Sequence, residues 1–247
     1  MNKDYRFEDF TEDGYCELLA LASAHWQFVS FGAVSPRPHV LWRHDVDVSP
    51  HRALRLAEIE SSAGVKATYF FLLHSLFYSC LEAPTRDIMR RIVGHGHDIG
   101  LHFDVAFYPD IDGLPSLEKR IVFEADIVAD LAGAKPAAVS FHNPTTEQLR
   151  NYDHAMLARL VNTYGEPLRT NYRYVSDSNG YWRFERLHDV LAAQQDPALQ
   201  VLTHPEWWVP DRRSPRDRVL RAVEGRAARC TQFYDDFLLA QGRENVR

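Results

Sequence analysis

The sequence predicts a single-domain α/β fold with a mostly parallel sheet that is barrel-like rather than open. Apolar runs typical of buried strands alternate with helical patterns along most of the chain, and this alternation favours parallel strands in one sheet. Polar side chains also follow the carboxyl ends of successive strands, which a closed parallel barrel gathers at one mouth. There is no linker-like shift in composition and no internal repeat. We therefore expect residues 1–247 to form one domain, with its chemistry between about residues 38 and 210.

Periodicity and capping residues predict the individual elements. Strands are predicted at apolar or β-branched runs that end at Asp47, Leu73, His102, His142 and Thr203. Helices are predicted at residues 10–24, 50–62, 85–93, 116–132, 146–160, 186–194 and 216–241. Suitable N-caps are Thr11, Ser49 and Ser116. The first and last helices are expected to pack outside the barrel.

Composition narrows the class of protein. Hydrophobic residues make up 45% of the chain, enough for a sizeable core, so disorder is not expected. The net charge of −6 argues against a nucleic-acid binder that relies on phosphate contacts. The three cysteines, Cys16, Cys80 and Cys230, have no metal or disulfide spacing and are expected to be thiols in a reducing compartment. With no apolar leader and no run of roughly 18 apolar residues, we expect no membrane span and a cytoplasmic location.

Two carboxylates at the end of one strand form the strongest candidate site. Asp45 and Asp47 lie one residue apart, after the apolar run at residues 40–42 and just before the helix predicted from residue 50. Arg43 and His44 precede them, and cations there would favour the ionised carboxylates. In parallel α/β sheets, ligands bind at this end of the strands. A salt-bridged loop pair is the alternative interpretation.

The later histidines turn the aspartate pair into a candidate hydrolytic metal site. Such a site needs two or three protein ligands and an open position for water. Asp47 and His102 supply two ligands, and His142 or Asp104 could supply the third. Imidazole with carboxylate suits zinc, although other divalent ions are possible. Asp45 would then act as the base for a water molecule whose pKa the metal lowers from 15.7 towards about 7.

His204 follows the last predicted strand and is a candidate general acid. Asp177 could hold its imidazole ring in one tautomer, and an Asx turn is the alternative role for this aspartate. Trp182, Trp207 and Trp208 could line a sugar or acyl pocket.

At these residues the sequence resembles the polysaccharide deacetylases, carbohydrate esterase family four. The resemblance covers roughly residues 38–210 and implies a single-domain, distorted (β/α) barrel with about seven parallel strands. The first motif of the family ends a strand with two aspartates, a catalytic base and then a metal ligand. Asp45 and Asp47 match these roles, with one residue between them. The second motif is similar to GHDIGLH at residues 96–102, which implies that His102 binds the metal.

The third motif of the family carries an arginine that braces the base and a backbone N–H that belongs to the oxyanion hole. SFHNPT at residues 140–145 resembles this motif, which makes the Thr145 N–H the candidate oxyanion donor. His142 replaces the arginine and could instead be a metal ligand. Arg43 could take over part of the bracing role.

The last two motifs pair an aspartate with the acid histidine. Asp177 and LTHP at residues 202–205 are similar to them, which implies that His204 is the acid and Asp177 its partner. The motifs in this order also resemble a cytoplasmic subgroup encoded among surface-polysaccharide genes for O-antigen and lipopolysaccharide biosynthesis. The resemblance implies a divalent metal, with zinc as the first choice, and an N-acylated amino sugar or glycan precursor as substrate, free, nucleotide-linked or lipid-linked. The expected substrate pocket is lined by Arg43, Trp207 and Trp208.

The chain departs from the family pattern four residues after His102, where Ala106 replaces the usual second metal-binding histidine. The metal shell is therefore incomplete, or it is completed by His142 or Asp104. Two functions follow. One is a metal-dependent hydrolase that removes an N-acyl group, by expectation acetyl, from an amino sugar. The other is a non-catalytic glycan-binding or assembly protein with a degraded metal site. The retained base and acid candidates favour the enzyme, because a pure binder does not require them.

Overall fold

The structure is a computed structural model, and it describes residues 5–33 and 35–246. The strands are β1 (Gln27–Phe28), β2 (His39–Val46), β3 (Thr68–Leu72), β4 (Asp98–Phe103), β5 (Ala138–Phe141), β6 (Met156–Leu157), β7 (Leu160–Asn162), β8 (Arg173–Ser176) and β9 (Ala198–Thr203). The α-helices are α1 (Glu12–Ser23), α2 (Pro50–Ser62), α3 (Ala83–Gly94), α4 (Leu114–Ala132), α5 (Thr146–Asn151), α6 (Glu166–Asn171), α7 (Leu187–Ala193) and α8 (Pro215–Ala240). Short 3₁₀ turns are η1 (Phe7–Phe10), η2 (Val105–Phe107), η3 (Ser178–Gly180) and η4 (Pro205–Trp207).

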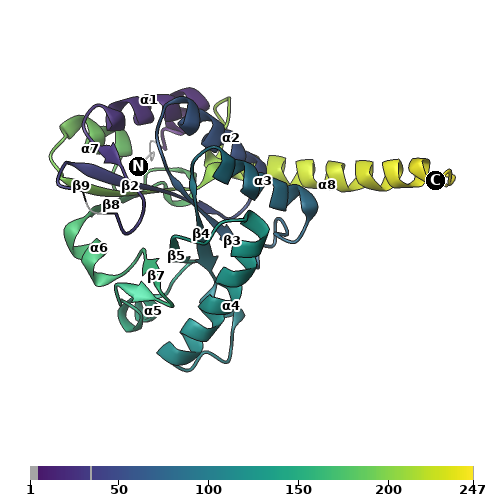
Figure 1. The fold of residues 1–247 in the computed structure, drawn as a ribbon. Helices are drawn as coiled ribbons and strands as arrows, with labels where there is room; N and C mark the ends of the chain where they lie inside the picture. Colours follow the sequence, from purple (N-terminus) through teal and green to yellow (C-terminus); the bar gives the residue numbers. More distant parts are fainter. Residues whose placement is uncertain (1–4, 34, 247) are drawn as a thin grey trace.

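One curled sheet forms the centre of the fold (Figure 1). Its strand order is β6-β7-β5-β4-β3-β2-β9-β8, with β1 paired to β2. Every ladder is parallel except the one between β6 and β7. The run from β7 to β8 therefore holds the parallel strands that the sequence predicted, and the α/β class is confirmed. The barrel is open on one side, because β6 and β8 share no ladder within the described part of the chain.

The two faces of the sheet differ in chemistry. On β2, Trp42 and Val46 belong to the large outer core beneath the helices, whereas Arg43 and Asp45 point into the barrel. Successive side chains of a strand point to opposite faces, so even-numbered and odd-numbered residues of β2 lie on different sides of the sheet. The strand is buried along nearly its whole length, as expected for the centre of a parallel sheet. The inner face thus collects the polar residues of several strands.

Most predicted elements are confirmed to within about two residues at their ends. The exception is the helix predicted at residues 146–160. There α5 spans six residues, and Ala158 and Arg159, with φ of 49° and 68°, turn the chain between the antiparallel strands β6 and β7. The Asn162 side chain donates to two carbonyls of the preceding loop. Pairing of β7 with β5 extends the sheet, and this long-range gain outweighs a weak local helical pattern.

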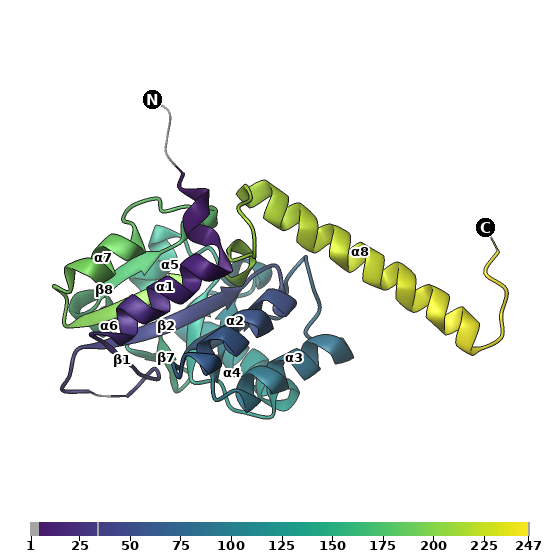
Figure 2. The same cartoon turned by 90° about the horizontal axis from the view of Figure 1, so that it is seen from above.

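Helix α8 leaves the body of the molecule (Figures 1 and 2). Its first turns contact η4, and Arg218 is the buried residue of this 26-residue helix. No helix in residues 5–33 or 35–246 combines the length and apolarity needed to cross a membrane.

Gly100 on β4 provides a test of packing inside the barrel. A Cβ at this position would overlap the ring of Phe70 on the neighbouring strand β3. We expect Gly100→Ala to lower the free energy of unfolding by about 1–3 kcal/mol, the usual cost of overpacking. Urea denaturation measures this change.

The matched control is Gly94→Ala at the end of α3, where a Cβ would meet no atom within 4 Å. This variant should be neutral or more stable by up to about 1 kcal/mol, because alanine favours a helix. Equal stability of the Gly100 variant and the wild type would show that the ring of Phe70 does not fill this space.

Candidate metal centre

Three potential metal ligands meet at the carboxyl ends of β2, β4 and β5. Asp47 follows β2, His102 lies near the end of β4, and His142 follows β5. Asp47 Oδ1 lies 3.1 Å from His102 Nε2 and 3.6 Å from His142 Nδ1, and the two imidazole nitrogens are 3.2 Å apart. In the described part of the chain, these three residues are the group of histidine, cysteine and acidic side chains that could hold a metal ion.

The spacing of the three atoms fits a small divalent metal. Ligands about 2.0–2.1 Å from a tetrahedral zinc ion are about 3.3–3.4 Å from one another, close to the three distances found here. His102 Nδ1 lies 3.2 Å from the Ser140 carbonyl, which accepts its N–H and leaves the Nε2 lone pair for the metal. Asp47 and His142 keep 22% and 23% of their side chains exposed, so the site is open to water.

The charges of the three groups support one another. Burial would raise the pKa of Asp47, but His102, His142 and His204 together hold it well below its usual value. A hydrogen bond to Asp47 raises the pKa of His142. An ionised Asp47 is thus available as a ligand at neutral pH.

Asp45 lies beside this group and is almost completely buried. Its Oδ2 accepts a hydrogen bond from Ser140 Oγ at 3.0 Å and lies 3.5 Å from Arg43 Nη2. Its Oδ1 is buried and has no hydrogen-bond partner. One carboxylate oxygen is therefore anchored, and the other is free to accept a proton.

His204 and Asp177 form a close pair on the other side of Asp47. Asp177 Oδ1 lies 2.6 Å from His204 Nδ1, and Asp177 Oδ2 accepts the backbone N–H of His204 at 2.8 Å. Burial would lower the pKa of His204, but the Asp177 carboxylate outweighs it and raises this pKa well above its usual value. His204 Nε2 points towards the site, 3.9 Å from Asp47 Oδ2. A protonated imidazole thus faces the candidate metal position.

The other predicted site residues lie outside the ligand group. Asp104 Oδ1 accepts the Ala106 N–H at 2.9 Å as a local cap. The Thr145 N–H donates to Gln148 Oε1 at 2.9 Å in the capping box of α5. Trp208 has no exposed surface and packs against Phe10 and Tyr15 in the outer core. Trp207 is partly buried, against the same core.

Arg43 is completely buried inside the barrel, next to Asp45. Its Nη2 donates to the Tyr164 hydroxyl at 3.0 Å, and its guanidinium lies 4.9 Å from the centre of that ring. Burial disfavours the cation, but Asp45 and Tyr164 outweigh this and raise the pKa of Arg43. This arginine braces the carboxylate from below and has no surface for substrate.

Sequence reasoning assigned no role to Ser140, Tyr164 or Glu206. Ser140 lies two residues before His142 on β5, so strand periodicity alone could have placed it on the inner face. Glu206 is buried, and burial raises its pKa well above the usual value despite the nearby His204. In the sequence, Glu206 directly precedes Trp207 and Trp208, and this apolar context was the signal that the glutamate is buried.

Comparison with known proteins found no matching family model and no matching curated protein. Solved structures with a similar course of the chain include a family 4 acetyl xylan esterase from Clostridium thermocellum with a cobalt ion, at 18% identity and a TM-score of 0.44, covering 76% of this chain and 84% of that one. The peptidoglycan deacetylase PdaC from Bacillus subtilis has 12% identity and a TM-score of 0.45, with 78% and 87% covered. A peptidoglycan N-acetylglucosamine deacetylase, Bc1960, has 16% identity and a TM-score of 0.45, with 85% and 90% covered. The likeness to these three structures concerns the course of the chain.

Metal affinity tests the ligand group directly. We expect the wild-type chain to bind about one zinc ion, as the three converging ligands imply. His102→Ala and His142→Ala should each lower the affinity by more than tenfold, because even residues that only orient ligands contribute 10–100-fold. Competition with a chromophoric chelator measures this. His188→Ala, an exposed histidine on α7, is the control. Unchanged affinity in His142→Ala would exclude His142 as a ligand.

The pair of His204 and Asp177 makes a second prediction. Removing the carboxylate charge in Asp177→Asn should lower the pKa of His204, because the anion favours the imidazolium. An NMR titration of the His204 ring signal measures the shift, and Asp126→Asn on the exposed face of α4 is the control. A His204 that titrates at the same pH in both variants would contradict the pairing.

Proposed function

We propose that the protein is a metal-dependent hydrolase that removes an N-acyl group, acetyl in the simplest case, from an amino sugar or glycan precursor. The observation that carries hydrolysis is the set of groups next to the three ligands: a carboxylate with a free oxygen and an imidazole held by a second carboxylate. The sugar substrate, the cytoplasmic setting and the link to O-antigen or lipopolysaccharide biosynthesis rest on the motif resemblance. We also propose that residues 1–247 act as one unit around this centre.

Asp45 is the proposed general base. Attack on the amide carbonyl carbon forms a bond to the oxygen of water, and the proton of that water passes to the free Asp45 Oδ1. Ser140 and Arg43 hold the other carboxylate oxygen, so the free oxygen keeps a fixed direction. Burial of Asp45 excludes bulk water, which would otherwise compete for this oxygen.

His204 is the proposed general acid. The C–N bond breaks as the imidazolium gives its Nε2 proton to the leaving nitrogen, which departs as an amine and leaves a carboxylic acid. Asp177 keeps His204 protonated before this step and holds the ring with Nε2 towards the site. Asp45 thus acts on the attacking water, and His204 acts on the leaving nitrogen.

Asp47, His102 and His142 are the proposed ligands of a divalent metal, with zinc as the first choice for a carboxylate and two imidazoles. Such an ion supplies Lewis acidity, which polarises the amide carbonyl and makes water more acidic. The Thr145 N–H can help to hold the carbonyl oxygen only when the Gln148 side chain leaves its capping position.

A non-catalytic glycan-binding protein was the alternative suggested by Ala106. That alternative was based on the missing second histidine at position 106, and His142, which follows β5, can supply the third ligand instead. A base and an acid beside the metal position have no purpose in a binder. We therefore favour the enzyme.

The decisive variant is Asp45→Asn. It keeps the shape and the Ser140 contact but cannot accept the proton, so acetate release should fall by about 10²–10⁴-fold. The assay offers N-acetylglucosamine, its UDP derivative and chitooligosaccharides to the zinc-loaded protein. Zinc content should stay at the wild-type level, and Asp130→Asn on α4 should retain full activity. An Asp45→Asn protein that hydrolyses an authentic substrate at the wild-type rate would refute this mechanism.

A further inference from the structure

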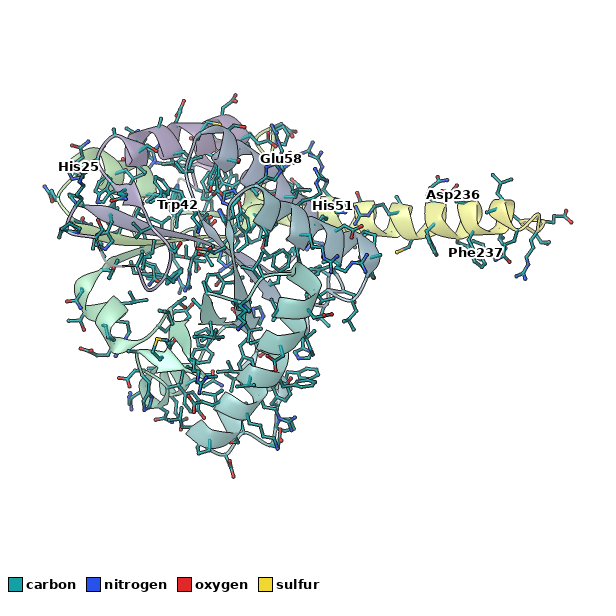
Figure 3. The ribbon with its side chains drawn as sticks, viewed as in Figure 1. His25, Trp42, His51, Glu58, Asp236 and Phe237 are labelled. Atoms are coloured by element: carbon teal, nitrogen blue, oxygen red, sulfur yellow. The ribbon has the colours of Figure 1, made fainter. Side chains whose placement is uncertain are left out.

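A cavity lies between α2, η4 and the first half of α8, and its wall begins one residue after the candidate metal ligand Asp47. It is a cleft of about 330 Å³, and five arginines contribute to its wall. Those arginines are Arg52, Arg218, Arg221, Arg226 and Arg229. Figure 3 places His51, at the start of α2, beside the inner part of α8 where this cleft opens. Five cations around one small cavity repel one another unless nearby carboxylates neutralise them.

Two of the five arginines are neutralised by protein carboxylates. Arg52 Nη2 lies 2.8 Å from Glu12 Oε1, and Arg226 Nη2 lies 2.6 Å from Glu82 Oε1. These pairs fix the cleft wall to α1 and to the residue before α3. They leave no excess charge of their own.

The other three arginines are less completely compensated. Arg218 is buried, and its guanidinium donates to the carbonyls of Gly180 and Phe7, while the Asp177 carboxylate, already bonded to His204, acts on it without a direct contact. Arg221 lies 3.7 Å from the exposed Asp211, a weak and solvent-screened contact. Within residues 5–33 and 35–246, no acidic oxygen lies within 4 Å of Arg229. Direct carboxylate contacts therefore balance only part of the positive charge in the cleft.

The acidic side chain in the cleft wall does not supply the missing charge. Glu206 Oε2 is buried without a hydrogen-bond partner, and burial raises the pKa of this carboxyl well above its usual value. A neutral Glu206 can donate a hydrogen bond to an anion. Burial lowers the pKa of His51, and the Arg229 cation lowers it further, so Arg229 acts on this part of the cleft wall.

The cleft and the metal centre share the same two loops. Val48 and Ser49 of the cleft wall directly follow the metal ligand Asp47, and Glu206 lies two residues after His204. The Cα atoms of Asp47 and Ser49 can be at most about 7 Å apart. One ligand can therefore place an amide at the metal position and an anionic group between the arginines.

We propose that this cleft binds a phosphate or diphosphate group carried by the substrate. Arginine side chains suit this chemistry because their guanidinium groups bind phosphate oxygens in pairs, and the positive end of α2 contributes to the same wall. That the phosphate belongs to the substrate rests on the function proposed above. The binding of an anion in this cleft does not depend on that function.

Calorimetric titration with inorganic pyrophosphate tests the site. The full-length chain is first stripped with EDTA and desalted, so that pyrophosphate cannot bind through a metal. The cleft variant is Arg221→Gln/Arg229→Gln. The control is Arg216→Gln/Arg243→Gln, which removes the same two charges from exposed positions that do not line the cleft. Circular dichroism confirms that both variants are folded.

We expect the wild type and the control to bind pyrophosphate alike, and the cleft variant to bind at least tenfold more weakly. Equal weakening in both variants would mean a general charge effect with an adventitious ion only, and no binding by the wild type would overturn the site outright. The assay needs neither metal nor turnover. A failed titration therefore counts against the cleft alone, and a failed amide-hydrolysis assay counts against the proposed function alone.

Two competitors identify the carrier of the phosphate. Uridine diphosphate represents a nucleotide-linked substrate, and phosphatidylcholine vesicles carrying a lipid pyrophosphate represent a lipid-linked one. Whichever displaces pyrophosphate from the wild type identifies the source and supports the substrate assignment. If neither does, the cleft does not belong to the substrate.

Discussion

Strand β2 carries ionisable side chains on both faces, and the rest of the structure depends on how each face is neutralised. On the outer face, His44 Nε2 lies 2.6 Å from Glu60 Oε1 of α2, and both side chains are completely buried. The hydroxyls of Tyr15 and Tyr69 donate to the same carboxylate. Burial would raise the pKa of Glu60, but His44 outweighs it and lowers this pKa. Removing one partner of a buried ion pair costs about 3–5 kcal/mol, because the other charge is left without a partner, so α2 has to keep Glu60 opposite His44.

The contacts of His44 on the outer face determine which residues of β2 point into the barrel. Because side chains alternate along a strand, His44 under the helices requires Asp45 to point into the barrel, where Ser140 and Arg43 receive it. A shift of one residue would bury Asp45 against α2 and direct His44 into the site. The helix layer therefore stabilises the chemistry indirectly, through the register of the central strand.

Local patterns were enough to predict the strands that end near Asp47, His102 and His142, because buried runs bounded by caps and glycines are short-range signals. The same approach failed at residues 146–160, where pairing of β7 with β5 decides the conformation. The spacing of Thr145 and Gln148 does indicate a capping box, so the loss of the Thr145 N–H to Gln148 could have been predicted locally. The burial of Trp208 could not, because it depends on packing against Phe10 and Tyr15 from distant parts of the chain.

The sequence by itself determined the residue types of the candidate site and the strand ends that carry them, because these follow from periodicity within a few residues. Only the tertiary structure decided that His142, and not Asp104, joins Asp47 and His102. That choice depends on the parallel pairing of β4 with β5, which brings together side chains 40 residues apart in sequence. The arginine cleft has the same origin, because α2 and α8 are far apart in the chain and form one wall only after the barrel has folded.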